Sequence, residues 1–179
     1  SAFLTDLYAD PEYADELLAF LTEAAILRAH AVDALRATPR AAAGLADDML
    51  QAISTRMFVD RILPHHRRYN DALDPEHSLP RSMHLCGDAT RHFCTLVREL
   101  EVQSFDTGFP VDFGALRREL GPDVEIMGGV EVALLLHGTP EQVYARARDI
   151  LTSGVLEGGR FVLREANNLP PRVPMENLA

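Results

Sequence analysis

Lysine and tryptophan are absent from the 179-residue sequence, and cysteine occurs only at Cys86 and Cys94. Two cysteines do not make the disulfide framework of a secreted domain. A signal peptide and an apolar run long enough to cross a membrane are also missing. The sequence therefore predicts a protein of the reducing cytoplasm that does not enter a membrane.

Positive charge is scarce as well. The 17 basic residues, all arginine, stand against 27 acidic residues, which gives a formal net charge of -10. Binding to nucleic acid or to an acidic membrane surface requires clustered positive charge, so this balance argues against both partners. A hydrophobic content of 47% over this length is enough for one domain with a packed core.

Apolar runs and helical patterns alternate along most of the chain. The five expected strands cover residues 42–46, 82–86, 104–107, 124–127 and 160–164. Such alternation predicts an α/β fold with a parallel sheet and right-handed crossovers. Ligands of these sheets gather beyond the carboxyl ends of the strands.

Helix signals separate these strands. Asp10-Pro11-Glu12 predicts the start of a helix of about 25 residues. Further helices are expected from the Ser54 cap to Leu73 with a kink at Pro64, from near Ala89 to Leu100, before Gly121, and from Thr139 to Gly154. Within the helix expected from near Ala89 to Leu100, we expect Cys94 to be buried in the core and His92 to be a surface or cap residue.

The segment His84-Leu85-Cys86 carries the most distinctive chemistry. If residues 82–86 form a strand, its period of two places His84 and Cys86 on the same side. Imidazole and thiolate are zinc ligands, and the following Gly-Asp can turn the chain into a helix. A buried cysteine beside an unrelated histidine on a core strand explains the same spacing, and spacing alone leaves both readings open.

Other polar residues follow the expected strands, as is usual for the loops of any α/β protein. They are Asp47, Asp48, Asp106, Gly128, Gly129, Glu131, Glu165, Asn167 and Asn168.

Several segments together resemble the uroporphyrinogen decarboxylase superfamily, which includes zinc-dependent enzymes that move methyl groups from methylcobalamin to thiols. The segments are Leu45-Ala46-Asp47-Asp48, Ile53-Ser54 with Phe58 to Pro64, Met83-His84-Leu85-Cys86-Gly87-Asp88, Gly128-Gly129-Val130 and Leu169-Pro170-Pro171-Arg172-Val173-Pro174-Met175-Glu176-Asn177. The resemblance implies a partial (β/α)8 TIM-type barrel, in which residues 1–179 supply about strands four to eight.

The methyltransferase branch of the superfamily implies roles for single residues. His84 and Cys86 match its zinc-binding His-x-Cys pair, but its second cysteine falls at Asn167, whose amide is a poor zinc ligand. A third ligand would then be Glu165, Asp48 or Asp47. We expect Asp48, Glu165 and Asn167 to act on a small-molecule substrate, with zinc and methylcobalamin as cofactors and a corrinoid protein as a possible partner.

Two alternatives remain open. Porphyrinogen decarboxylation in tetrapyrrole biosynthesis needs no metal, but its enzymes carry Gly-His-Gly where this chain has Ala166-Asn167-Asn168, and no cysteine is expected at position 86. The His-x-Cys pair therefore favours methyl transfer. The third reading is a non-catalytic half-barrel, inactive by itself, whose open edges favour self-association or pairing with a missing N-terminal half.

Overall fold

The computed structural model describes residues 2–178 and divides into two compact units. One unit comprises Ser1–Ala43 with Ser54–Pro80, and the other comprises Gly44–Ile53 with Arg81–Ala179. Among the described residues, no helix is both long enough and apolar enough to span a membrane. Each unit is described below by itself.

The first unit begins with two consecutive helices, α1 (Ala2–Ala9) and α2 (Pro11–Ala34). The start signal at Asp10 is confirmed, because its carboxylate accepts a hydrogen bond from the N–H of Tyr13 and Pro11 occupies the first helical turn. Ala14, Ile26 and Ala29 form the buried stripe of α2.

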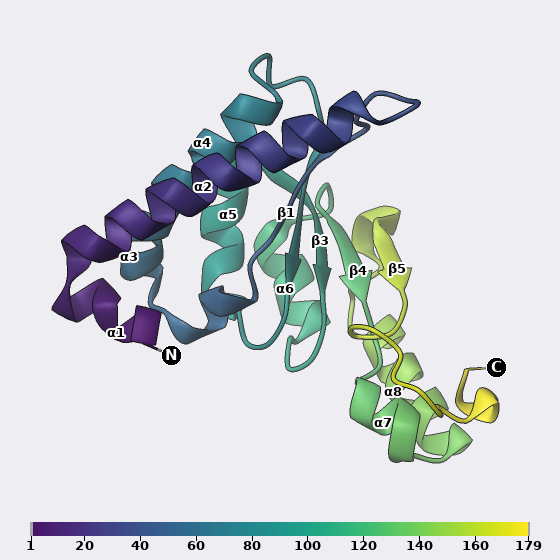
Figure 1. The fold of residues 1–179 in the computed structure, drawn as a ribbon. Coiled ribbons are helices and arrows are strands. Elements are labelled where there is room, and N and C mark those ends of the chain that lie inside the picture. Colours follow the sequence, from purple (N-terminus) through teal and green to yellow (C-terminus); the bar gives the residue numbers. More distant parts are fainter. Residues whose placement is uncertain (1, 179) are drawn as a thin grey trace. The chain divides into compact units, whose positions relative to one another are not determined.

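A second helical segment of this unit lies against α2 (Figure 1). It consists of α3 (Thr55–Met57), a π-helical turn η2 (Phe58–Ile62) and α4 (Leu63–Leu73), and Ser54 caps its start as expected. The irregularity lies just before Pro64, where the N–H of Leu63 bonds to the carbonyl of Phe58, five residues back. Proline has no N–H to continue the regular ladder, which explains why the helix is distorted at this point.

The second unit contains a sheet of five parallel strands in the order β1-β2-β3-β4-β5 (Figure 1). The strands are β1 (Ala43–Ala46), β2 (Arg81–Leu85), β3 (Val102–Thr107), β4 (Glu125–Gly128) and β5 (Phe161–Leu163). Sequence order equals spatial order, and β1 and β5 are the two edges, so the sheet is not closed. This is the expected α/β fold of a partial barrel.

The expected helices follow the strands, together with three additions to them. In chain order the helices are η1 (Asp48–Ala52), η3 (Thr90–His92), α5 (Phe93–Leu100), α6 (Phe113–Leu120), α7 (Val132–His137), α8 (Pro140–Thr152), η4 (Glu157–Gly159) and η5 (Met175–Asn177). The additions are η1, α7 and η4. The capping box at Thr139 and Gln142 is present. The short helix α7 was not expected, because an almost wholly apolar run of six residues has no helical periodicity to detect.

The strands of the sheet present two different faces. Met83, Phe105 and Ile126, adjacent in the register of β2, β3 and β4, are almost fully buried, and Phe105 meets Phe93 of α5 edge-on at 4.9 Å between ring centroids. The alternate residues His84 and Asp106 are only half-buried. Parallel sheets are normally covered on both sides, so a polar, half-open face is consistent with the interior of a partial barrel.

Cys94 of α5 lies opposite to expectation, whereas His92 occupies the N-cap position of α5, one of the two places expected for it. Cys94 is exposed, because it lies about 100° around the helix from the buried Phe93. His92 is fully buried, and its Nε2–H donates to the carbonyls of Leu50 at 2.9 Å and Ile53 at 3.2 Å. These bonds join η3 to the segment that follows β1.

Candidate metal centre

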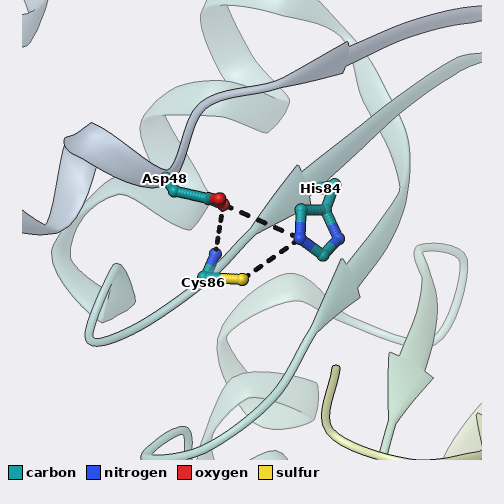
Figure 2. Close-up of side chains that lie close together, drawn as sticks. All are labelled: Asp48, His84 and Cys86. Atoms are coloured by element: carbon teal, nitrogen blue, oxygen red, sulfur yellow. Dashed lines mark hydrogen bonds and ion pairs between the residues drawn. The ribbon is translucent and has the colours of Figure 1, made fainter. Parts of the chain in front are cut away.

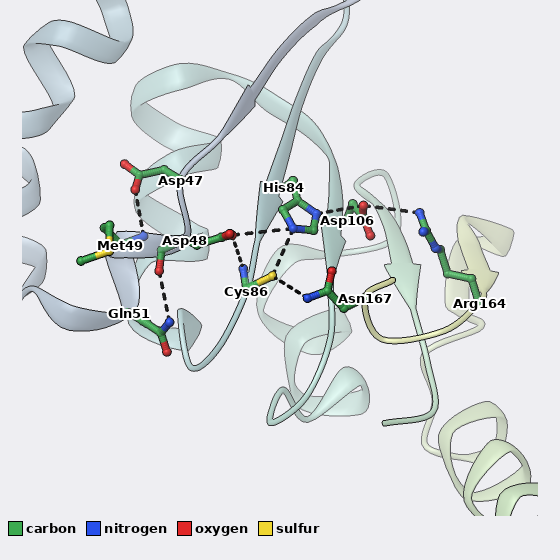
Figure 3. Close-up of polar contacts among 9 residues, drawn as sticks. All are labelled: Asp47, Asp48, Met49, Gln51, His84, Cys86, Asp106, Arg164 and Asn167. Carbon is green, nitrogen blue, oxygen red and sulfur yellow. Dashed lines mark hydrogen bonds and ion pairs between the residues drawn. The ribbon is translucent and has the colours of Figure 1, made fainter. Parts of the chain in front are cut away.

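Two aspartates follow β1 and have different tasks. The Asp47 carboxylate accepts a hydrogen bond from the N–H of Met49 at 3.1 Å and so caps η1. The Asp48 side chain lies toward β2, where its Oδ1 accepts a hydrogen bond from the N–H of Cys86 at 3.0 Å (Figure 3). Capping therefore uses Asp47 and leaves Asp48 beside the end of the next strand.

His84 and Cys86 converge at the end of β2 (Figure 2). The buried side chains of Met83 and Leu85 point to the helix-covered face, so His84 points to the opposite one. Its Nε2 lies 3.1 Å from the Cys86 Sγ and 3.7 Å from the Asp48 Oδ1. One nitrogen, one sulfur and one oxygen donor atom thus lie within 4.8 Å of one another.

The turn after Cys86 depends on a glycine. Gly87 has φ +70°, a left-handed conformation that favours glycine, and a Cβ there would collide with the amide of Gln51. The Gln51 amide in turn donates to the backbone carbonyl of Asp48 at 3.2 Å. The close approach of Gln51 therefore leaves no room for a side chain at position 87, and the Cys86 N–H bond to Asp48 joins the two loops.

Asp106 contacts the other nitrogen of the His84 ring, Nδ1. It is the register partner of His84 on β3, and its Oδ2 lies 2.9 Å from the His84 Nδ1 (Figure 3). Because a carboxylate only accepts, the Nδ1 carries a proton and donates it, and Nε2 is the ring nitrogen that faces Cys86 and Asp48. A carboxylate in this position is the usual outer partner of a metal-binding histidine.

Arg164 and Glu165 follow β5. The Arg164 Nη1 lies 3.4 Å from the Asp106 Oδ2, and its Nη2 donates to the Glu165 Oε1 at 2.7 Å. Glu165 is therefore directed to Arg164, and the structure does not bring it into the group of three donor atoms. This ion pair lowers the pKa of Glu165 and raises that of Arg164.

Asn167 lies on the other side of the sulfur. Its Nδ2 donates to the Cys86 Sγ at 3.2 Å, so the amide acts as a hydrogen-bond donor to the sulfur (Figure 3). Burial, followed by the hydrogen bond and charge of Asp48, raises the pKa of the Cys86 thiol, while the bond from Asn167 acts in the opposite direction. A divalent cation would reverse this balance, because it binds the thiolate form.

The donor set fits zinc. Imidazole nitrogen, thiolate sulfur and carboxylate oxygen are its ordinary protein ligands, and three protein ligands leave one position open for a substrate. His84, Cys86 and Asp48 supply these three donors, and Asp106 supplies the outer hydrogen bond that orients the histidine.

A pocket of about 220 Å³ adjoins the sulfur. It is lined by Cys86, Gly87, Phe109, Glu131, Val132, Ala133, Ala166 and Asn167. Its size suits a small molecule that approaches Cys86 along an aromatic and aliphatic wall.

Of the residues singled out from the sequence, the structure brings together Asp48, His84, Cys86 and Asn167, whereas Asp47 and Glu165 have other partners. Asp106 was not singled out as a partner of His84. The register of β2 against β3 would have identified Asp106, because the two residues are register partners on the same face of adjacent strands.

The fold and this cluster define an α/β protein whose candidate metal-binding side chains gather at the carboxyl edge of an open parallel sheet. The family model of uroporphyrinogen decarboxylase (URO-D) matches residues 1–179. The chain belongs to this family.

Two similar proteins come from Methanosarcina mazei. A methylated-thiol--coenzyme M methyltransferase is 34% identical over 128 residues, which are 70% of this chain and 32% of that protein. The solved structure of a methyltransferase matches with a TM-score of 0.74 at 19% identity, covering 98% of this chain and 50% of that one. The chain thus spans about a third to a half of the length of these proteins.

Proposed function

We propose that this chain carries the metal-binding part of a methyltransferase that moves a methyl group from a methyl-corrinoid, such as methylcobalamin, to a small thiol. The observation that carries the proposal is the convergence of the His84 Nε2, the Cys86 Sγ and the Asp48 Oδ1. The similarity to a protein named as a methylated-thiol methyltransferase supports the choice of reaction.

The five strands, on this proposal, are about strands four to eight of a (β/α)8 barrel. The half-open face that carries His84 and Asp106 is the barrel interior, and the metal centre lies at its carboxyl edge, where such barrels place their active sites. The match to half of a solved methyltransferase supports this division. The remaining strands, or a partner chain, would cover the open face.

Each side chain has a task in this reaction. His84, Cys86 and Asp48 hold the metal, Asp106 keeps the proton on the His84 Nδ1, and Asn167 donates to the sulfur. Bound zinc lowers the pKa of a coordinated thiol, so that the substrate is present as a thiolate nucleophile. A bound methyl-corrinoid would supply the methyl group: the substrate sulfur would form a bond to the methyl carbon, and the electron pair of the broken cobalt–carbon bond would stay with the corrinoid.

Porphyrinogen decarboxylation is the second candidate, because the matching family is named for it. That reaction has no use for the cluster of the Cys86 thiol, the His84 imidazole and the Asp48 carboxylate. Metal binding separates the two candidates, since only methyl transfer calls for it here.

The experiment is a metal analysis of the purified chain and of two cysteine variants. We expect about one zinc ion per chain, lost in Cys86→Ala and retained in Cys94→Ala, the matched control that removes the exposed thiol. The loaded chain is then mixed with methylcobalamin and a thiol, and formation of cob(I)alamin is followed by absorbance. Zinc binding without transfer would favour the non-catalytic half-barrel, and a folded chain without zinc would contradict the proposal.

A further inference from the structure

The first structural unit contains a pocket that the proposed methyl transfer does not use. It has a volume of about 200 Å³ and is lined by Ala25, Arg28, Ala29, Val32, Arg36, Arg40 and Tyr69. Three of its seven lining residues are arginines, in a chain whose net charge is -10. Three arginines around one pocket favour the binding of an anion.

The hollow forms because α2 presents small side chains where it lies beside α4. Ala25 and Ala29 are one helical turn apart on α2, and Tyr69 of α4 contributes an aromatic wall. The lining therefore combines apolar and aromatic side chains with three basic ones. This combination suits a ligand that joins an anionic group to a small organic part.

Asp33 forms ion pairs with two of the three arginines, and its hydrogen bonds go to Arg40. The Arg36 Nε lies 3.0 Å from the Asp33 Oδ1, and the Arg40 Nη2 lies 2.7 Å from the Asp33 Oδ2. The Arg40 side chain is only 16% exposed, so its position is further restricted by packing. Arginines that are already held lose less conformational entropy when a ligand binds.

Arg28 differs from both, because it makes no ion pair among the residues that the structure describes. Helix neighbours three and four positions away are the usual partners of an exposed arginine. For Arg28 these are Ala24, Ala25, Ala31 and Val32, none of which carries a charge. Among the described residues, Asp33 is the one carboxylate that forms ion pairs with these three arginines, so positive charge exceeds negative charge by two within this group.

We propose that this pocket binds a phosphate group, either as free phosphate or as the phosphate of a small organic ester. A dianion matches this excess of two positive charges, and guanidinium forks match the geometry of phosphate oxygens. The phenol of Tyr69 supplies a further hydroxyl group at the wall of the pocket. The site shares no residue with the candidate metal centre, and all of its lining residues belong to the first unit.

The test is a calorimetric titration of the purified chain with inorganic phosphate and, separately, with phenyl phosphate. Arg28→Gln is the informative variant, because Arg28 has no ion pair whose loss would disturb folding. Arg118→Gln is the matched control, since it removes the same charge from an exposed helical position outside the pocket. Melting temperatures of both variants report whether they remain folded.

We expect saturable binding that Arg28→Gln weakens about tenfold and that Arg118→Gln leaves unchanged. Added sodium chloride weakens it, because the pocket is open to solvent and its charges are screened. Tighter binding of phenyl phosphate would assign an organic phosphate, and equal binding would assign free phosphate. Absence of saturable binding, or an equal loss in the two variants, would overturn the proposal.

Discussion

The Nδ1 of His84 lies 2.9 Å from the Oδ2 of Asp106, and the two residues are direct register partners on adjacent parallel strands. The hydrogen bond is therefore set by the sheet itself rather than by a flexible loop. It fixes both the orientation of the ring and the nitrogen that carries the proton.

Loss of this carboxylate is expected to weaken metal binding without removing a ligand. Asp106→Asn should lower zinc affinity roughly 10- to 100-fold, because the amide can rotate to present a donor and no longer holds the Nδ1 proton. Competition with a chromophoric chelator measures the affinity. Glu125→Gln is the matched control, since Glu125 lies on the neighbouring strand and bonds to Ser104 instead. Equal affinities of Asp106→Asn and the unmodified chain would show that the imidazole needs no outer partner.

Asn167 offers a gain-of-affinity experiment. Its Nδ2 lies 3.2 Å from the Cys86 Sγ, so a side chain at this position reaches the centre. Asn167→Cys replaces a poor ligand with a thiolate and should tighten zinc binding about tenfold or more. Asn168→Cys adds the same thiol at the exposed neighbouring position and serves as the control. If both variants bind zinc equally, position 167 does not face the metal.

Local patterns in the sequence were sufficient to predict the alternation of strands and helices and a common side for His84 and Cys86. The period of two along a strand is a local property, and the caps at Asp10, Ser54 and Thr139 act within one helical turn. These features need no knowledge of the tertiary fold. They were therefore found where they were expected.

Other features depend on contacts between distant segments and could not be predicted in this way. The pairing of His84 with Asp106 requires the register of β2 against β3. The burial of His92 requires two carbonyl groups from a segment about 40 residues earlier. The sequence could not show which of the two neighbouring aspartates lies at the metal centre. Asp47 caps η1, and the Asp48 side chain points toward Cys86 instead.

Arg117 is expected to be a major contributor to the stability of the second unit. It is 1% exposed, and its guanidinium group donates to the backbone carbonyls of Gly121, Val124, Val155 and Arg160. Arg117→Met leaves these carbonyls without their donor, which should lower the free energy of unfolding by roughly 3 to 5 kcal/mol. Urea unfolding followed by circular dichroism measures the loss. The adjacent Arg118→Gln, at an exposed position, should change it by less than about 0.5 kcal/mol.

The buried imidazole of His92 should make stability depend on pH. Burial lowers its pKa below the ordinary value of 6.5, so the native protein favours the neutral ring. As the pH falls below about 6.5, His92 gains a proton in the unfolded chain before it does so in the native chain. The stability that the neutral, buried His92 contributes is therefore lost as the pH falls from that value toward the folded pKa. His92→Gln keeps a donor for the carbonyls of Leu50 and Ile53 but removes the titration. Urea unfolding between about pH 8 and about pH 5 should show a smaller decline for this variant than for the unmodified chain. Parallel declines would mean that the ring is protonated equally in both states.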